Sequence, residues 1–93
     1  MIEVRIPAAL RDDAQGRATI AVDASGACTV AAVLNLLFAQ YPRLRARVLD
    51  DTGAVRRFVN VFVDDVELAR SLDTAVSDGA TVYIFHSIAG GAM

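Results

Sequence analysis

The residues of this chain that most clearly indicate a chemical role are two adjacent glycines near its C-terminal end, Gly90 and Gly91. Glycine has no Cβ, so a diglycine packs poorly, costs much backbone entropy to order, and fits clefts that are too narrow for other residues. Near a chain end, such a pair indicates a flexible arm that presents the carbonyl group of Gly91 to another protein. Ala92 and Met93 follow, so the carboxyl group of Gly91 lies within a peptide bond.

The rest of the sequence offers no catalytic or metal-binding pattern. Its one histidine, His86, and its one cysteine, Cys28, have no further His or Cys at the spacing of metal ligands. A cysteine just before a helix can be reactive, but a buried structural cysteine is far more common, and we favour that interpretation for Cys28. We find no nucleophile, base and acid at catalytic spacing and no glycine-rich phosphate loop. We therefore expect a chain that binds no cofactor and is not itself an enzyme.

Composition narrows the classes of partner. A length of 93 residues with 55% hydrophobic content predicts one folded domain. The net charge of −2 argues against nucleic acid, because that partner requires clustered cations. All nine basic residues are arginine, so no side-chain amine can accept an isopeptide bond. A single cysteine, no signal-peptide pattern and no apolar run of roughly 20 residues predict a cytoplasmic protein without membrane association.

Two strands are predicted in the N-terminal part. Apolar residues alternate with charged ones from Ile2 to Ile6, and Pro7 stands where this strand would end. Residues 8–16, which include Asp12 and Asp13, are predicted to form a loop. Residues 17–22 read as a second strand, which we expect to form a hairpin with the first, and residues 23–26 as a turn.

One helix is predicted in the middle of the chain. Thr29 is a suitable N-cap, and apolar residues then recur with the helical period at Val30, Val33, Leu34, Leu37, Phe38 and Tyr41. Pro42 should end this helix, because the residue before a proline is disfavoured in the α region. We expect residues 43–55 to be irregular.

The C-terminal half predicts strands at 57–63 and 81–85, with a Ser-Asp-Gly turn at 77–79 and an ambiguous segment between them. The economical solution is an α+β fold, a mixed four- to five-stranded sheet with one main helix packed on one face. We expect one domain over residues 1–86 and a flexible tail over residues 87–93.

The uncovered face of this sheet should carry aromatic side chains. Asn60 would be costly to bury unpaired, so its side of the strand is assigned to solvent. Strand alternation then places four aromatic residues on the solvent side: Phe58, Phe62, Tyr83 and Phe85. Such a patch usually marks a protein-interaction site. The alternative is that the two faces are swapped or that a loop covers the patch.

The element order, the segment Arg57-Phe58-Val59-Asn60-Val61-Phe62-Val63-Asp64-Asp65, the Asp78-Gly79 turn and the Gly90-Gly91 tail together resemble one family. This is the MoaD/ThiS family of ubiquitin-like sulfur carriers, which have the β-grasp fold. The middle strand and the Ala-Gly-Gly end resemble the CysO-type carriers of cysteine biosynthesis in particular. The resemblance covers essentially the whole chain.

The resemblance implies a role for each part of the chain. An E1-like adenylating enzyme of the MoeB/ThiF type would use ATP to adenylate the Gly91 carboxylate, and sulfur would then displace AMP to give a thiocarboxylate. Ala89 and Gly90 would thread the channel of the partner, while Asn60 and the four aromatic residues would lie on the docking face. A downstream synthase would accept the sulfur, with cysteine or a specialised metabolite favoured as the product.

The chain departs from the family in two places. Many members have a proline shortly before the tail, where this chain reads His86-Ser87-Ile88. Ala92 and Met93 also follow the diglycine, as in carriers whose extension a zinc-dependent JAMM-type peptidase removes between the positions of Gly91 and Ala92. The alternative is a member without carrier activity. A second class also stays open, namely a ubiquitin-like protein modifier or a non-catalytic β-grasp interaction module.

Overall fold

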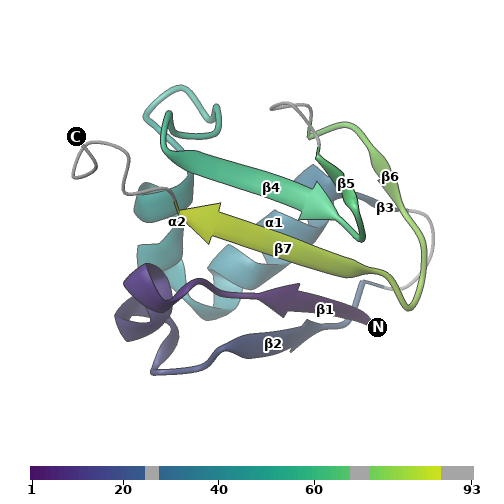
Figure 1. Ribbon diagram of the computed structural model, residues 1–93, viewed down its shortest axis with the longest axis horizontal. Helices are drawn as coiled ribbons and strands as arrows, with labels where there is room; N and C mark the ends of the chain where they lie inside the picture. The colour runs from purple at the N-terminus through teal and green to yellow at the C-terminus, as the bar shows by residue number, and fades with distance from the viewer. Residues whose placement is uncertain (25–27, 68–71, 87–93) are drawn as a thin grey trace.

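The first and last strands of the chain pair at the centre of a five-stranded sheet (Figure 1). The computed structural model describes residues 1–24, 28–67 and 72–86. Its elements, in chain order, are β1 (Ile2–Arg5), the 3₁₀ helix η1 (Ala8–Ala14), β2 (Thr19–Val22), β3 (Cys28–Thr29), α1 (Val30–Gln40), α2 (Pro42–Val48), β4 (Val59–Val63), β5 (Val66–Glu67), β6 (Ala75–Val76) and β7 (Thr81–His86).

The sheet has the strand order β2-β1-β7-β4-β5 and is mixed. β1 runs parallel to β7, with Val4 opposite Val82, and antiparallel to β2, with Val4 opposite Ile20. β4 runs antiparallel to β7 and β5 antiparallel to β4. The predicted N-terminal hairpin is therefore confirmed, and β7 is hydrogen-bonded on both edges.

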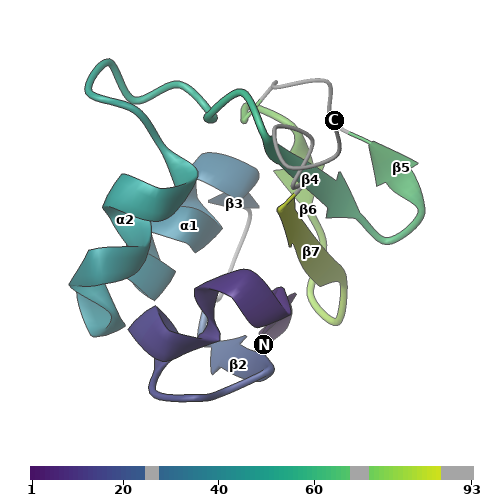
Figure 2. The same ribbon diagram turned by 60° about the vertical axis from the view of Figure 1, so that its left-hand side comes forward.

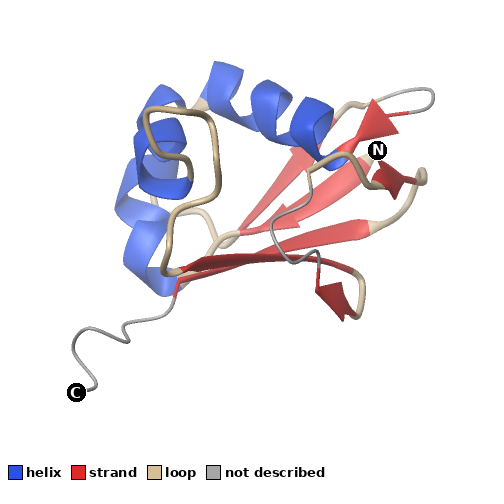
Figure 3. Cartoon of the chain, turned by 90° about the horizontal axis from the view of Figure 1, so that it is seen from above, coloured by secondary structure: helices blue, strands red, loops and turns tan. Residues whose placement is uncertain are grey.

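The helices cover one face of this sheet (Figure 2, Figure 3). Their apolar side chains and the inward residues of the strands form one core, which contains Val4 of β1, Leu37 of α1, and Val82 and Ile84 of β7. The expected α+β fold with a mixed sheet is confirmed. A second sheet of two strands, β3 and β6, lies beside the start of α1.

The N-terminus of α1 is held by its predicted cap. The Thr29 hydroxyl accepts a hydrogen bond from the backbone N–H of Ala32 at 3.2 Å. The N–H groups of Val30 and Ala31 donate to backbone carbonyls of residues 74 and 72. Together with Ala32, three N–H groups that have no acceptor within the helix are thus hydrogen-bonded. At the other end, Tyr41 has φ −132° and ψ 77°, outside the α region, as expected before Pro42.

The segment that follows corrects the sequence prediction, because Pro42 begins a second helix instead of an irregular stretch. Proline is well suited to the first helical position, where its fixed φ is already helical and its missing N–H is not needed. Leu44 and Val48 then lie one turn apart and are both buried, which anchors α2 on the core. A seven-residue helix carries too short a periodicity to stand out in the sequence.

The predicted loop over residues 8–16 is also corrected. Residues Ala8–Ala14 form η1, in which Leu10 and Ala14 are buried, and Asp12 and Asp13 therefore lie on a helix instead of a turn. The Asp13 carboxylate pairs with the Arg47 guanidinium of α2 at 3.0 Å. Burial of Leu10 favoured the helix where the polar composition of the segment had suggested a loop.

Among the residues that the structure describes, no helix combines the length and the apolar character needed to cross a membrane.

Substitution of Leu44 tests whether α2 is packed into the core. Leu44→Ala should lower the free energy of unfolding by about 2–5 kcal/mol, because it leaves a cavity at a fully buried position. Leu36 of α1 is 41% exposed, and Leu36→Ala should cost less than about 0.5 kcal/mol. Urea denaturation followed by circular dichroism measures both. Equal losses would contradict the packing of α2.

The loop between α2 and β4 is organised by Asp50. One oxygen of its carboxylate accepts hydrogen bonds from the Thr52 hydroxyl at 2.6 Å, the Thr52 N–H at 2.8 Å and the Ala54 N–H at 3.1 Å. The hydrogen bonds from Thr52 lower the pKa of the Asp50 carboxyl from its ordinary value of 3.8. Donors to a carboxylate favour its charged form, so the loop is stabilised by the ionised group.

A lowered pKa gives this loop a defined pH dependence. Its contribution to stability should be fully present above pH 3.8, the ordinary value of the carboxyl, and should be lost as the pH falls through the lower pKa of the folded state. Asp50→Asn should therefore destabilise the protein at neutral pH and progressively less below pH 3.8. Urea unfolding over this pH range measures the difference. Asp51→Asn, which removes the same charge from the same turn, is the control.

Candidate functional site

Three aromatic rings meet on the face of the sheet opposite the helices. The Phe62 and Phe85 ring centroids lie 5.2 Å apart with an interplanar angle of 85°, an edge-to-face contact. Tyr83 and Phe85 lie 6.1 Å apart and nearly parallel, at 6°. Both separations fall in the range of favourable aromatic pairs. We call Phe62, Tyr83 and Phe85 the aromatic face; its outermost ring, Phe85, is 48% exposed.

Strand alternation and register together create this surface. β4 and β7 pair antiparallel with Phe62 opposite Tyr83 and Asn60 opposite Phe85, so these four side chains share one face. Their neighbours Val61 and Ile84 are buried on the other face. The sequence-based assignment of the two faces is therefore right, and Asn60 is exposed as expected. The role of this face in partner binding stays a prediction.

Phe58 is the exception among the four aromatic residues predicted to form the patch. It precedes β4, is 42% exposed, and lies under the Arg57 guanidinium, whose carbon is 5.9 Å from the ring centroid. In the described part of the chain, the ring-to-ring contacts join only the three residues of the aromatic face. The predicted patch of four is thus a cluster of three with a separate neighbour.

Charged residues border the aromatic face, and sequence reasoning did not assign them to it. The Arg5 guanidinium of β1 lies 6.0 Å from the Tyr83 ring centroid, since Arg5 is the register partner of Tyr83. On the other side, a hollow of about 370 Å³ is lined by the aromatic face together with Asp64 and Asp65. The alternation of β1 indicated that Arg5 points outward, but the pairing of β1 with β7 was needed to place it.

The predicted residues of the tail lie outside the described part of the chain. These are Ala89, Gly90, Gly91 and Ala92. The last described residue is His86, which ends β7 opposite Val59 and shares the covered side of the sheet with Ile84 by alternation. A hollow of about 320 Å³ at this end of β7 is lined by Asp50, Arg56, Arg57, Phe58, Val59 and His86.

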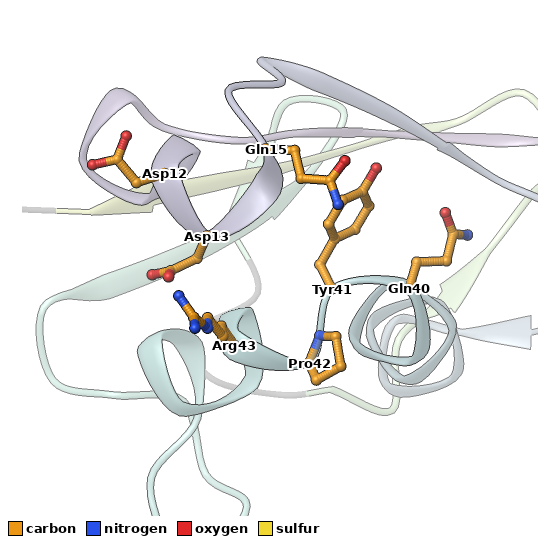
Figure 4. Close-up of a pocket in the computed structure, with 7 residues that line it drawn as sticks. All are labelled: Asp12, Asp13, Gln15, Gln40, Tyr41, Pro42 and Arg43. Carbon is orange, nitrogen blue, oxygen red and sulfur yellow. The ribbon is translucent and has the colours of Figure 1, made fainter.

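A third hollow lies between η1 and the junction of α1 with α2 (Figure 4). It measures about 280 Å³ and is lined by Asp12, Asp13, Gln15, Gln40, Tyr41, Pro42 and Arg43. Asp13 already pairs with Arg47, and the described residues of the lining include no cysteine, serine or histidine that could act as a nucleophile or base. Within the described residues, no group of three or more His, Cys, Asp or Glu side chains could hold a metal ion.

Comparison of the chain with known proteins agrees with the fold described above. The sequence model of the ThiS family matches residues 4–91. The chain is 38% identical over 94 residues to the sulfur carrier protein CysO of Mycobacterium bovis. The alignment covers 97% of this chain and 98% of that protein. The sulfur carrier protein CysO of Mycobacterium tuberculosis matches with the same identity and coverage.

Solved structures share the fold over nearly the whole chain. CysO of Mycobacterium tuberculosis has a TM-score of 0.82 at 32% identity, covering 95% of this chain and 100% of that one. CysO in the BexX/CysO complex of Amycolatopsis orientalis has a TM-score of 0.84 at 30% identity. The match covers 98% of this chain and 100% of that one. Small archaeal modifier protein 1 of Haloferax volcanii has a TM-score of 0.83 at 29% identity, covering 94% and 97%. The chain therefore belongs to the ThiS family and has the ubiquitin-like β-grasp fold of its sulfur carriers.

Proposed function

We propose that this chain is a small sulfur carrier whose reactive group is the carboxyl group of Gly91. The observation that carries the proposal is the extent of the family match, which ends at Gly91 and leaves Ala92 and Met93 beyond it. The similarity to mycobacterial sulfur carrier proteins over 97% of the chain supports the same role. The chain is then a co-substrate of partner enzymes instead of an enzyme.

The chemistry explains why the chain needs no catalytic residue of its own. A carboxylate is a poor electrophile, so an E1-like adenylating enzyme of the MoeB/ThiF type would transfer AMP from ATP to Gly91 and release pyrophosphate. Sulfur at the oxidation level of sulfide would then attack the acyl carbon, AMP would leave, and a thiocarboxylate would form. Glycine leaves this carbonyl unobstructed, while the folded domain holds the reacting end in position. ATP is bound by the partner, and this chain holds no cofactor.

Removal of Ala92 and Met93 must come before adenylation. Whatever follows Met93, Gly91 is joined to Ala92 by a peptide bond and has no free carboxylate. A JAMM-type zinc peptidase would hydrolyse this bond, and its zinc would activate the attacking water. The zinc in this step belongs to the peptidase.

The aromatic face is the proposed docking surface for the adenylating enzyme. Three clustered rings on a rigid sheet provide exposed apolar area at low entropic cost, and aromatic anchors often dominate the energy of an interface. CysO of Amycolatopsis orientalis was solved in a complex with BexX, which supports protein partners for this chain as well. A downstream synthase would accept the sulfur, for cysteine or for a specialised metabolite.

A second function is favoured by one observation. The fold is as similar to small archaeal modifier protein 1 as to the CysO carriers, so a protein modifier that forms amide bonds through Gly91 is the alternative. Modifier chains linked through lysine are excluded, because the sequence contains none. The two functions need the same activated Gly91 and differ in the acceptor.

Mass spectrometry tests the carrier function and the processing step together. The full-length chain and a chain ending at Gly91 are each incubated with ATP, sulfide and the adenylating enzyme. Only the chain ending at Gly91 should gain the mass difference between sulfur and oxygen. Sulfur acceptance by the full-length chain would contradict the need for processing, and acceptance by neither form would contradict the carrier function.

Gly91→Ala in the chain ending at this residue should reduce adenylation about tenfold or more, because a side chain beside the reacting carbonyl clashes in a channel shaped for glycine. The rate of pyrophosphate release measures the effect. The thermal unfolding temperature should be unchanged, since Gly91 lies in the tail that the sequence predicts to contribute nothing to the folded domain. An unchanged rate would remove the steric argument for the terminal glycine.

Phe85→Ala tests the docking surface. It should raise the KM of the adenylating enzyme for the chain ending at Gly91 about tenfold, corresponding to about 1.4 kcal/mol, with kcat little changed. Leu36→Ala is the matched control, because Leu36 is also exposed and apolar but lies on α1, on the opposite side of the sheet. Similar effects of the two substitutions would contradict docking through the aromatic face.

A further inference from the structure

The hollow at the end of β7 carries a charge pattern that the proposed function leaves unused. Its lining includes two arginines, Arg56 and Arg57, and the imidazole of His86, and Asp50 is the only carboxylate among its described residues. It lies at the last described residue of β7, and Gly91 follows five residues later. A chain segment of that length reaches at most about 17 Å.

Arg56 is fixed in place and still has donors to spare. Its backbone N–H donates to the Val48 carbonyl at 2.9 Å and its Nε–H donates to the Ala46 carbonyl at 2.6 Å. Both carbonyls belong to the C-terminal turn of α2, where carbonyls lack helical partners and a cation is favoured. A guanidinium has five N–H donors. The terminal nitrogens of Arg56 form no hydrogen bond with the described residues.

Arg57 contributes a second guanidinium to the lining of the hollow. Its central carbon lies 5.9 Å from the Phe58 ring centroid, a cation–π arrangement that holds the planar group against the aromatic ring. Phe58 is 42% exposed and lines the hollow as well. The ring thus contacts one of the two cations of the hollow.

Asp50, the one carboxylate among the described residues of the lining, offsets only part of this charge: its pKa is lowered mainly by the hydrogen bonds from Thr52 and least by the charge of Arg56. An oxygen of Asp50 is engaged by three hydrogen bonds from its own loop, two from Thr52 and one from Ala54. The described residues of the lining thus carry two cations and one internally bonded anion, in a chain whose overall charge is −2. A local excess of positive charge in a negatively charged protein is an attractive site for an anion.

His86 adds a polar atom that is not satisfied. Its Nδ1 is buried and has no hydrogen-bond partner among the described residues. Leaving such an atom unpaired costs about 1–3 kcal/mol, so native structures rarely keep one without a reason. An unsatisfied ring nitrogen beside two guanidinium groups is the pattern of a polar site that is incomplete without a ligand.

We propose that this hollow binds the carboxylate of an aspartate or glutamate side chain of the enzyme that adenylates Gly91. The inference rests on the proposed function and adds a second contact to the aromatic face. Guanidinium donors match the two oxygens of a carboxylate in a bidentate geometry, which fixes orientation as well as position. The acidic residue of the partner must then lie within about 17 Å of the site where Gly91 reacts.

Nuclear magnetic resonance tests the pocket directly. The full-length chain, labelled with ¹⁵N, is titrated at low salt with a hexaglutamate peptide. Resonances of Arg56, Arg57 and His86 should shift, and Arg56→Gln should weaken the fitted Kd about fivefold or more. Arg17→Gln removes an exposed arginine that precedes β2, which β1 and β7 separate from β4 in the sheet, and it should leave Kd within about twofold. No shift at these three residues would overturn the proposal.

Two further arms separate the alternative explanations. Arg56→Lys keeps the charge but loses the fork and its Nε bond to Ala46, so it should bind better than Arg56→Gln; equal losses would indicate a purely structural arginine and overturn the proposal. Inorganic phosphate should shift the same resonances less than the peptide. Two results would assign the hollow to a different occupant and overturn the proposal. One is stronger binding of phosphate than of the peptide, and the other is loss of peptide binding in the chain ending at Gly91.

Adenylation kinetics then connect the pocket to the partner. Arg56→Gln in the chain ending at Gly91 should raise KM about fivefold, with kcat within about twofold and a KM that depends less on salt. An unchanged KM would contradict the choice of partner. If the wild-type chain is not adenylated at all, the carrier function fails, and the peptide titration still decides whether the hollow binds carboxylates.

Discussion

The structure depends on the pairing of β7, which is hydrogen-bonded to β1 along one edge and to β4 along the other. The parallel contact between β1 and β7 joins the two ends of the described chain, so the sheet is complete only when both ends have folded. Asp64, in the turn after β4, reinforces the start of β7: its N–H donates to the Thr81 carbonyl at 2.8 Å and its carboxylate accepts from the Thr81 N–H at 3.1 Å. A central strand with both edges bonded is a rigid base for whatever follows it.

Alternation along this one strand divides the molecule into two sides. Val82 and Ile84 enter the core beneath the helices, while Tyr83 and Phe85 join Phe62 on the open side. Hydrophobic burial of the first set fixes the register, because a slip of one residue would exchange the two sets of side chains. The stability of the core and the position of the aromatic face are therefore one constraint.

Two surfaces of different chemistry adjoin the C-terminal half of β7. The aromatic face offers apolar area with Arg5 and two aspartates at its border, and the hollow beyond Val59 offers arginine donors. Apolar contacts contribute affinity, whereas a charged contact mainly fixes orientation and accelerates encounter. Both properties would serve the proposed function, in which one carbonyl group is delivered to the active site of a partner.

The sequence by itself determined much of this protein, through local signals. Period-2 alternation identified the strands and their faces, the Thr29 cap and Tyr41-Pro42 bounded α1, and the family resemblance gave the β-grasp fold, which the comparisons support. Local patterns were misleading where a short segment is stabilised by burial: η1 and α2 are helices because Leu10, Leu44 and Val48 enter the core, although polar composition and Pro42 suggested loops.

Only the tertiary structure decided which distant residues meet. Arg5 reaches Tyr83 through the pairing of the first and last strands, and Arg56 reaches Ala46 and the neighbourhood of His86 through the loop that closes over the end of α2. No periodicity records such contacts, because they join segments that are far apart along the chain. The sequence predicts Gly91 as the reactive residue, and the fold decided which surfaces surround the strand that precedes it.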